Sequence, residues 1–475
     1  MPAKKRARRG VRDSDQPAST PAVATTSPGL PGPAALPVLV AGVLIACFVA
    51  QCLLSMRQQS ATFDEPVYIA AGYSYVETGD FRLKQDAPPL VSTLSGVALK
   101  IGTAFGNTVV FDAGSRLWSA RTEYAFAQRF LAGAGNRLRT LQIARLPVVM
   151  IGALLAIYLY GFGRILIGGY GAFLPLVLFC FDPNMIAHAR TVSNDMAVAA
   201  FFFIAHFHLY RLAADDSRTN QLALAAAIAL TTVAKFSGLL VFPSLLLTAA
   251  VFYAFPAAAA ILPGHARPAE WRRRFLAAAV RSLLMSMAAS LVVIGALYQS
   301  AAGPAQYLAG VRSIYTNFSP GFQFYLLGGF SPVASWYYYL VAMAVKTPDV
   351  TVLLFAVAVG SLLIRDLRPS RHAWLLVPVA LVLAVCSQDP VTLGLRRVLL
   401  VYPFLFLWIG TRCGLLWERW WPDARHVKSD PATRRHGPAV ATDWRSPPGY
   451  GERRGRRQTP DERQHQCLRA TTGIA

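Results

Sequence analysis

Charged residues are scarce in this chain of 475 residues, in which 15% are Asp, Glu, Lys or Arg and 54% are hydrophobic. A soluble domain usually carries about a quarter charged residues, so the composition argues against an ordinary soluble protein. The apolar residues also form runs long enough to cross a hydrocarbon layer as helices. These runs predict an all-α polytopic membrane protein of about ten transmembrane helices, near 36–56, 143–163, 170–187, 196–212, 221–236, 237–256, 276–298, 350–365, 372–387 and 398–416.

The sequence also lacks paired metal-binding or disulfide motifs. None of its six cysteines forms a CxxC pattern, and five of them lie inside the apolar runs. Such a distribution indicates neither a disulfide framework nor a zinc site. His206 and His208 are two residues apart on a predicted helix and cannot share a face. We therefore expect no metal and no other cofactor.

Acidic residues are few: 24 Asp and Glu stand against 46 Lys and Arg. Much of the excess lies in two segments, AKKRARRGVR at 3–12 and GERRGRRQTPDERQ at 451–464. A basic cluster before a first span sets membrane orientation, and a localisation signal or RNA-binding arm is the alternative. We expect no nucleic-acid partner. Residues 1–35 and 421–475 are predicted to be disordered basic tails that flank a transmembrane domain at 36–420.

The positions of the short Arg-rich loops predict the orientation of the spans. With a cytoplasmic N-terminus, residues 57–141 form a large first outer loop and residues 299–349 a second one. The loops RLAADDSRTN and HARPAEWRRRF then lie in the cytoplasm. This count requires 221–256 to form a hairpin, although Lys235 and Ser237 at its tip are weak turn residues. The expected location is the cell inner membrane, with functional groups facing outside.

Several charged residues fall where spans meet the outer surface. Asp64 and Glu65 directly follow the first apolar run, while Lys346, Arg396 and Arg397 border later runs. A charge at such a depth is a functional hypothesis by default. A cation alone could also snorkel to lipid headgroups. Because several converge on the same predicted side, we interpret them as candidate site residues.

Two further features have competing interpretations. Asp195, in RTVSNDMA, is a second acidic candidate, or a charge that complements the dipole of a helix N-terminus. The nearby His188 is interpreted as structural. The segment WYYY at 336–339 could line a sugar site or form an interfacial aromatic belt. Asp64 itself could cap the helix that begins at Pro66, which is compatible with catalysis.

A series of motifs resembles the polyprenyl-phosphate-dependent glycosyltransferases of the GT-C superfamily, in particular family 39. That group includes the protein O-mannosyltransferases and the aminoarabinose transferases that act on lipid A. The resemblance runs from the first span to about residue 410 and implies a GT-C-type helical bundle. The motifs are, in chain order, TFDEPVYIAAGYSYVETGDF, DAPPL, HARTVSNDMA, AKFSGLLVFP, GGFSPVASWYYYLVAMAVKTP and LGLRRVLLVYPFLFL.

The resemblance implies transfer of a sugar from a polyprenyl phosphate to an acceptor hydroxyl, usually with inversion. Phosphate is a stable leaving group, so one carboxylate base is enough, provided that cations stabilise the departing anion. By resemblance Asp64 is the base, and Glu65 orients it or the acceptor. The candidates for the phosphate contact are Arg396, Arg397 and Lys346, because guanidinium groups bind phosphate oxygens in pairs.

The sequence departs from the family pattern around DAPPL. Family members usually have histidine before the two prolines and a basic residue after them, where this chain has Ala87 and Ser92. Lys84 or Lys100 would then supply the missing charge. The expected partners are the bilayer and a polyprenyl-phosphate sugar; the sequence does not indicate the acceptor. The alternatives are a multi-pass transporter or a shortened, inactive relative.

Overall fold

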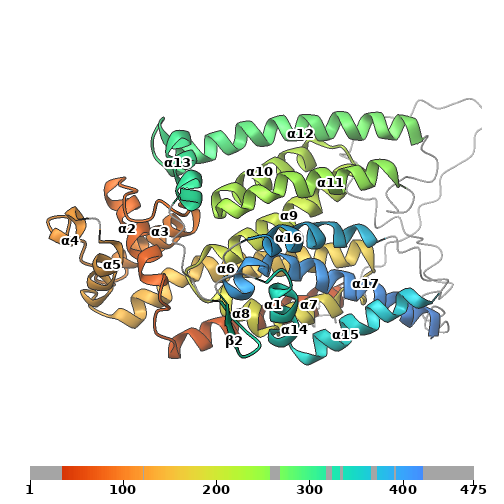
Figure 1. Ribbon diagram of the computed structural model, residues 1–475, viewed down its shortest axis with the longest axis horizontal. Helices are drawn as coiled ribbons and strands as arrows, with labels where there is room; N and C mark the ends of the chain where they lie inside the picture. The colour runs from red at the N-terminus through yellow and green to blue at the C-terminus, as the bar shows by residue number, and fades with distance from the viewer. Residues whose placement is uncertain are drawn as a thin grey trace, which may run out of the picture. The chain divides into compact units, whose positions relative to one another are not determined.

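Helices make up nearly all of the fold (Figure 1). The computed structural model describes residues 35–120, 122–256, 268–316, 324–331, 335–364, 372–389 and 392–420. Met1–Leu416 form one compact unit, and in the remainder only the end of the last helix is described. The tails predicted at 1–35 and 421–475 lie outside the described residues, except for Ala35.

Long apolar helices run side by side in this unit. Within the described ranges, six stretches are long and apolar enough to span a membrane. They are α1 (Ala35–Ser55) with η1 (Met56–Gln58), α6 (Arg137–Leu166), α9 (Asn194–Ala214), η2 (Phe236–Leu240) with α11 (Val241–Ala254), α12 (Pro268–Leu297), and η7 (Leu399–Val401) with α17 (Tyr402–Trp420).

The other predicted runs also coincide with helices, but these helices are short or broken. Run 170–187 is divided by a break before Pro183 into α7 (Phe173–Cys180) and α8 (Pro183–Ala189). The remaining runs correspond to α10 (Arg218–Ala234), α15 (Asp349–Gly360) with η3 (Ser361–Leu363), and η5 (Ala373–Leu375) with α16 (Leu376–Ser387). The prediction of a polytopic helical membrane protein is therefore confirmed.

Part of the predicted second outer loop, 299–349, is an apolar helix. Residues Tyr338–Lys346 form the apolar helix α14, which meets α15 at a bend of 119°. A proline follows α14 at Pro348 and ends the helical pattern, because proline cannot continue a helix. Together α14 and α15 make a candidate broken span, so part of the expected loop is membrane-type helix.

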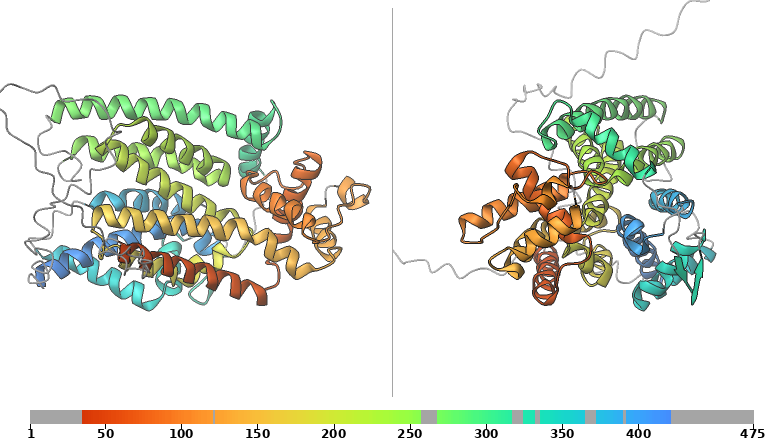
Figure 2. Two further views of the ribbon diagram at one scale, coloured as in Figure 1. Left: turned by 180° about the vertical axis from the view of Figure 1, so that it is seen from behind. Right: turned by 60° about the vertical axis from the view of Figure 1, so that its left-hand side comes forward.

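The predicted first outer loop, 57–141, folds into its own group of helices. These are α2 (Glu65–Thr78), α3 (Leu90–Ala104), α4 (Arg116–Ser119) and α5 (Glu123–Ala132). Figures 1 and 2 show this group beyond the ends of the long helices. Helices α2 and α3 cross at glycines: a Cβ on Gly72 would lie 1.8 Å from the carbonyl oxygen of Ser92. Only glycine permits so close an approach.

The second outer loop contributes α13 (Gly303–Thr316) and a hairpin of β1 (Phe324–Leu326) and β2 (Gly329–Ser331). Leu327 and Gly328 connect the strands with positive φ angles of 50° and 87°. Positive φ at both central residues is what a two-residue type I′ hairpin requires. The 3₁₀ helix η6 (Gly394–Arg397) lies between α16 and α17.

Helix α9 lies at the centre of the bundle. Every residue from Asn194 to His206 is buried, and α9 packs against α6, α10 and α11 (Figure 1). The aromatic rings of Phe202 and Phe203 contact Phe404 of α17 edge-on. A helix that is apolar on all sides is expected in such a position. Its packing fixes the place of its first turn, which carries Asp195.

Candidate functional site

Asp64 connects the first and last parts of the described chain. Its Oδ2 accepts a hydrogen bond from Nη1 of Arg396 at 3.2 Å, and its Oδ1 accepts one from the hydroxyl of Tyr124 at 3.1 Å. The Asp64 side chain makes no capping bond to α2, although the residue stands at the N-cap. The side chains of Asp64 and Arg396 are 35% and 41% exposed, so reactants can reach them.

A second carboxylate, Asp195, pairs with a cation that the sequence did not reveal. Nζ of Lys235 lies 2.6 Å from its Oδ1, and Nδ1 of His188 lies 3.8 Å from its Oδ2. Lys235 stands between α10 and η2, at the tip of the predicted 221–256 hairpin. A residue interpreted as a weak turn former is thus a partner of the second acid.

Asp64 and Asp195 lie in one electrostatic environment, since the charges of both act on Tyr68 of α2 and on Arg396. Burial raises the pKa of Tyr68, and the negative charges of Asp195, Asp86 and Asp64 raise it further. The positive charge of Arg396 acts in the opposite direction. A phenol so placed stays protonated and can donate a hydrogen bond at neutral pH. The structure therefore brings the acids of α1–α2 and α9 to one site with Arg396.

Lys84 borders the same site. It is 8% exposed, its Nζ lies 2.9 Å from Asp86, and it stands over the ring of Tyr68 at 5.3 Å. Burial raises the pKa of the neighbouring Glu123, whereas the charge of Lys84 lowers it. The other sequence candidate, Lys100, instead forms an exposed pair with Glu77 at 2.6 Å. Of the two lysines considered, only Lys84 is in contact with site residues.

The remaining basic candidates gather around η6. Arg397 forms an ion pair with Asp389. Nζ of Lys346 lies 4.0 Å from where a Cβ would stand on Gly394, and the lysine is exposed. Lys346 and Arg397 thus flank the segment that carries Arg396. Tyr339 of the WYYY segment is buried, whereas Trp336 is exposed.

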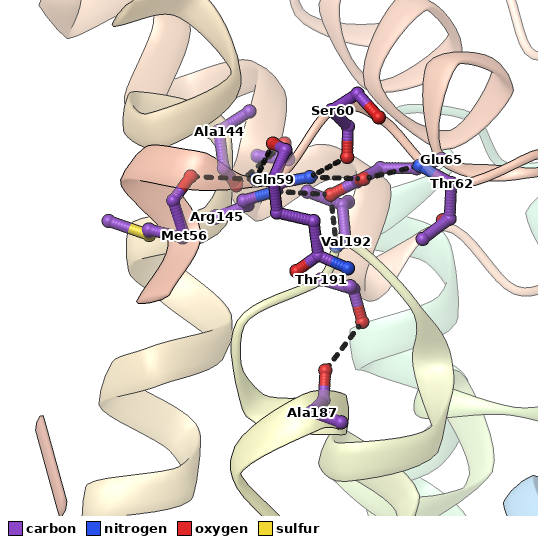
Figure 3. A network of polar contacts seen from close by, with 11 residues as sticks. Met56, Gln59, Ser60, Thr62, Glu65, Ala144, Arg145, Ala187, Thr191 and Val192 are labelled. Atoms are coloured by element: carbon purple, nitrogen blue, oxygen red, sulfur yellow. Dashed lines mark hydrogen bonds and ion pairs between the residues drawn. The ribbon is translucent and has the colours of Figure 1, made fainter. Parts of the chain in front are cut away.

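Glu65 is enclosed in the protein (Figure 3). Its carboxylate accepts two hydrogen bonds from Arg145 of α6, both at 2.7 Å, and both side chains are fully buried. It also accepts bonds from the backbone N–H groups of Val192 at 2.9 Å and Thr62 at 3.1 Å. Arg145 in turn donates to the carbonyl oxygens of Met56, Gln59 and Ser60.

This network fastens the end of the first span to two other parts of the site. Through Val192 it holds the segment just before Asp195, and through Thr62 it holds the segment just before Asp64. A buried charge with four satisfied bonds has no free face for a substrate. The expectation that Glu65 orients Asp64 or the acceptor stays a prediction, and the contacts of Glu65 are with Arg145 and with the backbone before Asp64 and Asp195.

The sequence did not indicate three residues that contact the candidate acids: Tyr124, Lys235 and Arg145. Arg145 carried a usable signal, because a charge two residues inside the run 143–163 requires a partner. Tyr124 and Lys235 carried none, since their partners are distant in the chain. Among the described residues, no group of three His, Cys, Asp or Glu side chains is arranged to hold a metal.

Comparisons with known proteins agree with this architecture. The family model of the dolichyl-phosphate-mannose-protein mannosyltransferases matches residues 127–261, which include Arg145, Asp195 and Lys235. The crystal structure of ArnT from Cupriavidus metallidurans in the apo state is similar in fold, with a TM-score of 0.53 and 15% identity. The similarity covers 82% of this chain and 62% of that one. No curated protein sequence matches the chain.

ArnT from Cupriavidus metallidurans bound to undecaprenyl phosphate is also similar, with a TM-score of 0.49 and 16% identity over 80% of this chain and 59% of that one. The present chain thus spans less than two thirds of the length of these solved structures. The family match and the fold confirm the resemblance to the GT-C superfamily.

Proposed function

We propose that this chain is a membrane glycosyltransferase that transfers a sugar from a polyprenyl phosphate to an acceptor hydroxyl at the outer face of the membrane. The observation that carries the proposal is the Asp64–Arg396 contact, in which an accessible carboxylate and an accessible guanidinium meet at the α2–α5 end of the bundle. The lipid tail holds the phosphate of the donor at the membrane surface. In this proposal the base and the phosphate ligand therefore lie side by side at the place that the donor phosphate occupies.

Asp64 acts as the general base in this proposal. Its Oδ1 is oriented by the Tyr124 hydroxyl, while Oδ2 faces Arg396. The acceptor hydroxyl gives its proton to Asp64 as its oxygen forms the new bond to the anomeric carbon. A carboxylate is suited to this step because the acceptor loses its proton only as attack proceeds.

Arg396 stabilises the leaving group. The bond between the anomeric carbon and the phosphate oxygen breaks as the new bond forms, and its electron pair remains on the phosphate. A guanidinium fork can bind two phosphate oxygens at once. Arg397, Lys346 and Lys84 add positive charge on either side. Attack from the face opposite the phosphate gives inversion.

Asp195 holds the second cation. Its short contact holds the ammonium group of Lys235 at the carboxylate, which also contacts His188 and interacts electrostatically with Arg396. A buried carboxylate with a lysine partner is stable as a pair and costly to leave alone. We therefore assign Asp195 to the positioning of Lys235 for the phosphate. Glu65 positions the backbone segments that carry Asp64 and Asp195.

A transporter is the main competing function. Transporters place their coupling charges near the middle of the bilayer, at breaks in paired repeats. Here the accessible pair of Asp64 and Arg396 lies at the start of α2. An enzyme that works at the membrane surface explains this placement better.

The test is transfer itself. Membranes that contain the full chain are given radiolabelled polyprenyl-phosphate sugars, and label is followed from carrier to acceptor. We expect label to leave the carrier for at least one sugar and to be blocked by Asp64→Asn. No release from any carrier, with the protein present and folded, would refute the proposal.

A further inference from the structure

A large aromatic side chain stands exposed directly beside the candidate base. Phe63 precedes Asp64 and is 79% exposed, although phenylalanine is usually buried. Its ring lies 5.0 Å from the ring of Tyr124, with 36° between the planes. The two rings form a tilted pair at the edge of the site. The pair offers a flat apolar surface next to the carboxylate of Asp64.

The aromatic pair has a fixed position relative to Asp64. The Tyr124 hydroxyl donates to the Asp64 carboxylate, and Phe63 packs against the same tyrosine ring. The backbone around Phe63 is also held, since the N–H of Thr62 donates to the buried Glu65. A ligand that covers Phe63 is therefore brought within reach of Asp64.

The environment of the pair distinguishes a ligand platform from a membrane anchor. Tyr124 belongs to α5, which lies with α2–α4 beyond the ends of the long helices in both views (Figures 1 and 2). The partner ring of Phe63 is thus part of the group outside the spans. Asp86 and Glu123 add negative charge nearby, which disfavours contact with anionic headgroups.

We propose that Phe63, supported by Tyr124, is the platform on which a pyranose ring of the acceptor stacks. A sugar ring has an apolar face of C–H groups, which the electron-rich face of an aromatic ring attracts. Stacking leaves the hydroxyl groups at the edge of the sugar free, and one of them meets Asp64. This inference rests on the proposed function and adds the acceptor class: a glycan or glycolipid.

The first experiment measures sugar binding without catalysis. The full chain is placed in nanodiscs as Phe63→Trp, with Phe105→Trp as a matched control. Phe105 is 73% exposed and also follows a helix of the α2–α5 group, so each variant gains one exposed tryptophan. We expect neutral oligosaccharides such as maltotriose or chitotriose to shift the emission of Phe63→Trp only. Brominated lipids should quench both variants equally.

The possible results of this experiment distinguish a sugar from membrane lipid as the ligand of Phe63. Strong quenching of Phe63→Trp by brominated lipid, without a sugar response, would make Phe63 a membrane anchor and overturn the proposal. The absence of any response to sugars, in whichever lipid, overturns it as well. Undecaprenyl phosphate binding is measured on the same proteins. Failure of the parent chain to bind undecaprenyl phosphate would refute the proposed function. The sugar response tests only the stacking role of Phe63.

The second experiment uses transfer from labelled donors to the acceptors of native membranes. Phe63→Leu keeps apolar bulk but removes the flat ring, and should lower transfer roughly tenfold. Phe63→Tyr should retain transfer, and Phe105→Leu should behave like the parent chain. Equal transfer by Phe63→Leu and the parent would contradict the stacking role, since leucine serves a membrane anchor equally well.

Discussion

Arg396 donates a hydrogen bond from Nη1 to Oδ2 of Asp64 at 3.2 Å, although 332 positions separate the two residues in the chain. The contact joins η6, near the last span, to the start of α2. It gives one site both a base and a cation. It also means that a donor phosphate must share or replace the carboxylate as the partner of Arg396.

Replacement of Arg396 therefore tests the phosphate contact. We expect Arg396→Lys to keep the charge but weaken undecaprenyl phosphate binding, because an ammonium group lacks the paired donors of guanidinium. The loss of a charge-assisted bond costs about 1.5–3 kcal/mol, or roughly ten- to a hundredfold in the dissociation constant. Binding to the purified variant is the measurement, with exposed Arg116→Lys as the control. Unchanged affinity in both Arg396→Lys and Arg396→Ala would exclude the contact.

The buried Glu65–Arg145 pair should be costly to break by removing one partner. Arg145→Met leaves Glu65 charged and enclosed, and breaking a buried pair in this way costs about 3–5 kcal/mol. Thermal unfolding in detergent should show a clear drop for Arg145→Met and partial recovery in Glu65→Leu/Arg145→Met, which carries no unpaired charge. Lys100→Met, in the exposed Glu77 pair, is the control and should unfold with the parent. An unaltered transition in Arg145→Met would argue against the positioning role.

The glycine crossing of α2 and α3 makes a steric prediction. A Cβ on Gly72 or Gly96 would lie within about 2 Å of backbone oxygen, at 1.8 Å and 2.0 Å. Alanine at either position should force the helices apart and destabilise this group by about 1–3 kcal/mol. Gly161→Ala is the matched control, because a Cβ there meets no atom within 4 Å. If Gly72→Ala and Gly161→Ala unfold at the same temperature, the close crossing is absent.

The orientation of the site makes a separate prediction. Reporter fusions after residue 110, in the α2–α5 group, should be external, and fusions after residue 268 should be cytoplasmic. The physical reason is the excess of arginine in the short loops that adjoin α12 and α10. A cytoplasmic signal from the fusion at residue 110 would contradict the prediction that the site faces outward.

Sequence patterns predicted the long spans well, because hydrophobic length is a local property. They did not indicate the helix Tyr338–Lys346, because lysine and proline at the end of this short apolar segment lower its mean hydropathy. They also gave no account of the α2–α3 crossing, which depends on contacts between separate helices.

The site was predictable in part for a similar reason. Asp64 and Arg396 stood out because each lies at a span end, and the structure brings them together. Which cation faces Asp195 could not be predicted, since Lys235 and Asp195 meet only when α9 and α10 pack. Glu65 was predicted to orient Asp64 or the acceptor, but its burial against Arg145 could not be predicted, because that contact depends on the packing of α6.

The most direct test of the central claim is the rate of sugar transfer by Asp64→Asn. Asparagine keeps the size of the side chain and can still accept a bond from Tyr124, but it cannot take the acceptor's proton. Transfer from a labelled polyprenyl phosphate should fall by on the order of a hundredfold or more, while undecaprenyl phosphate binding and protein level stay near those of the parent. Transfer at the parental rate in a folded Asp64→Asn protein would contradict the account.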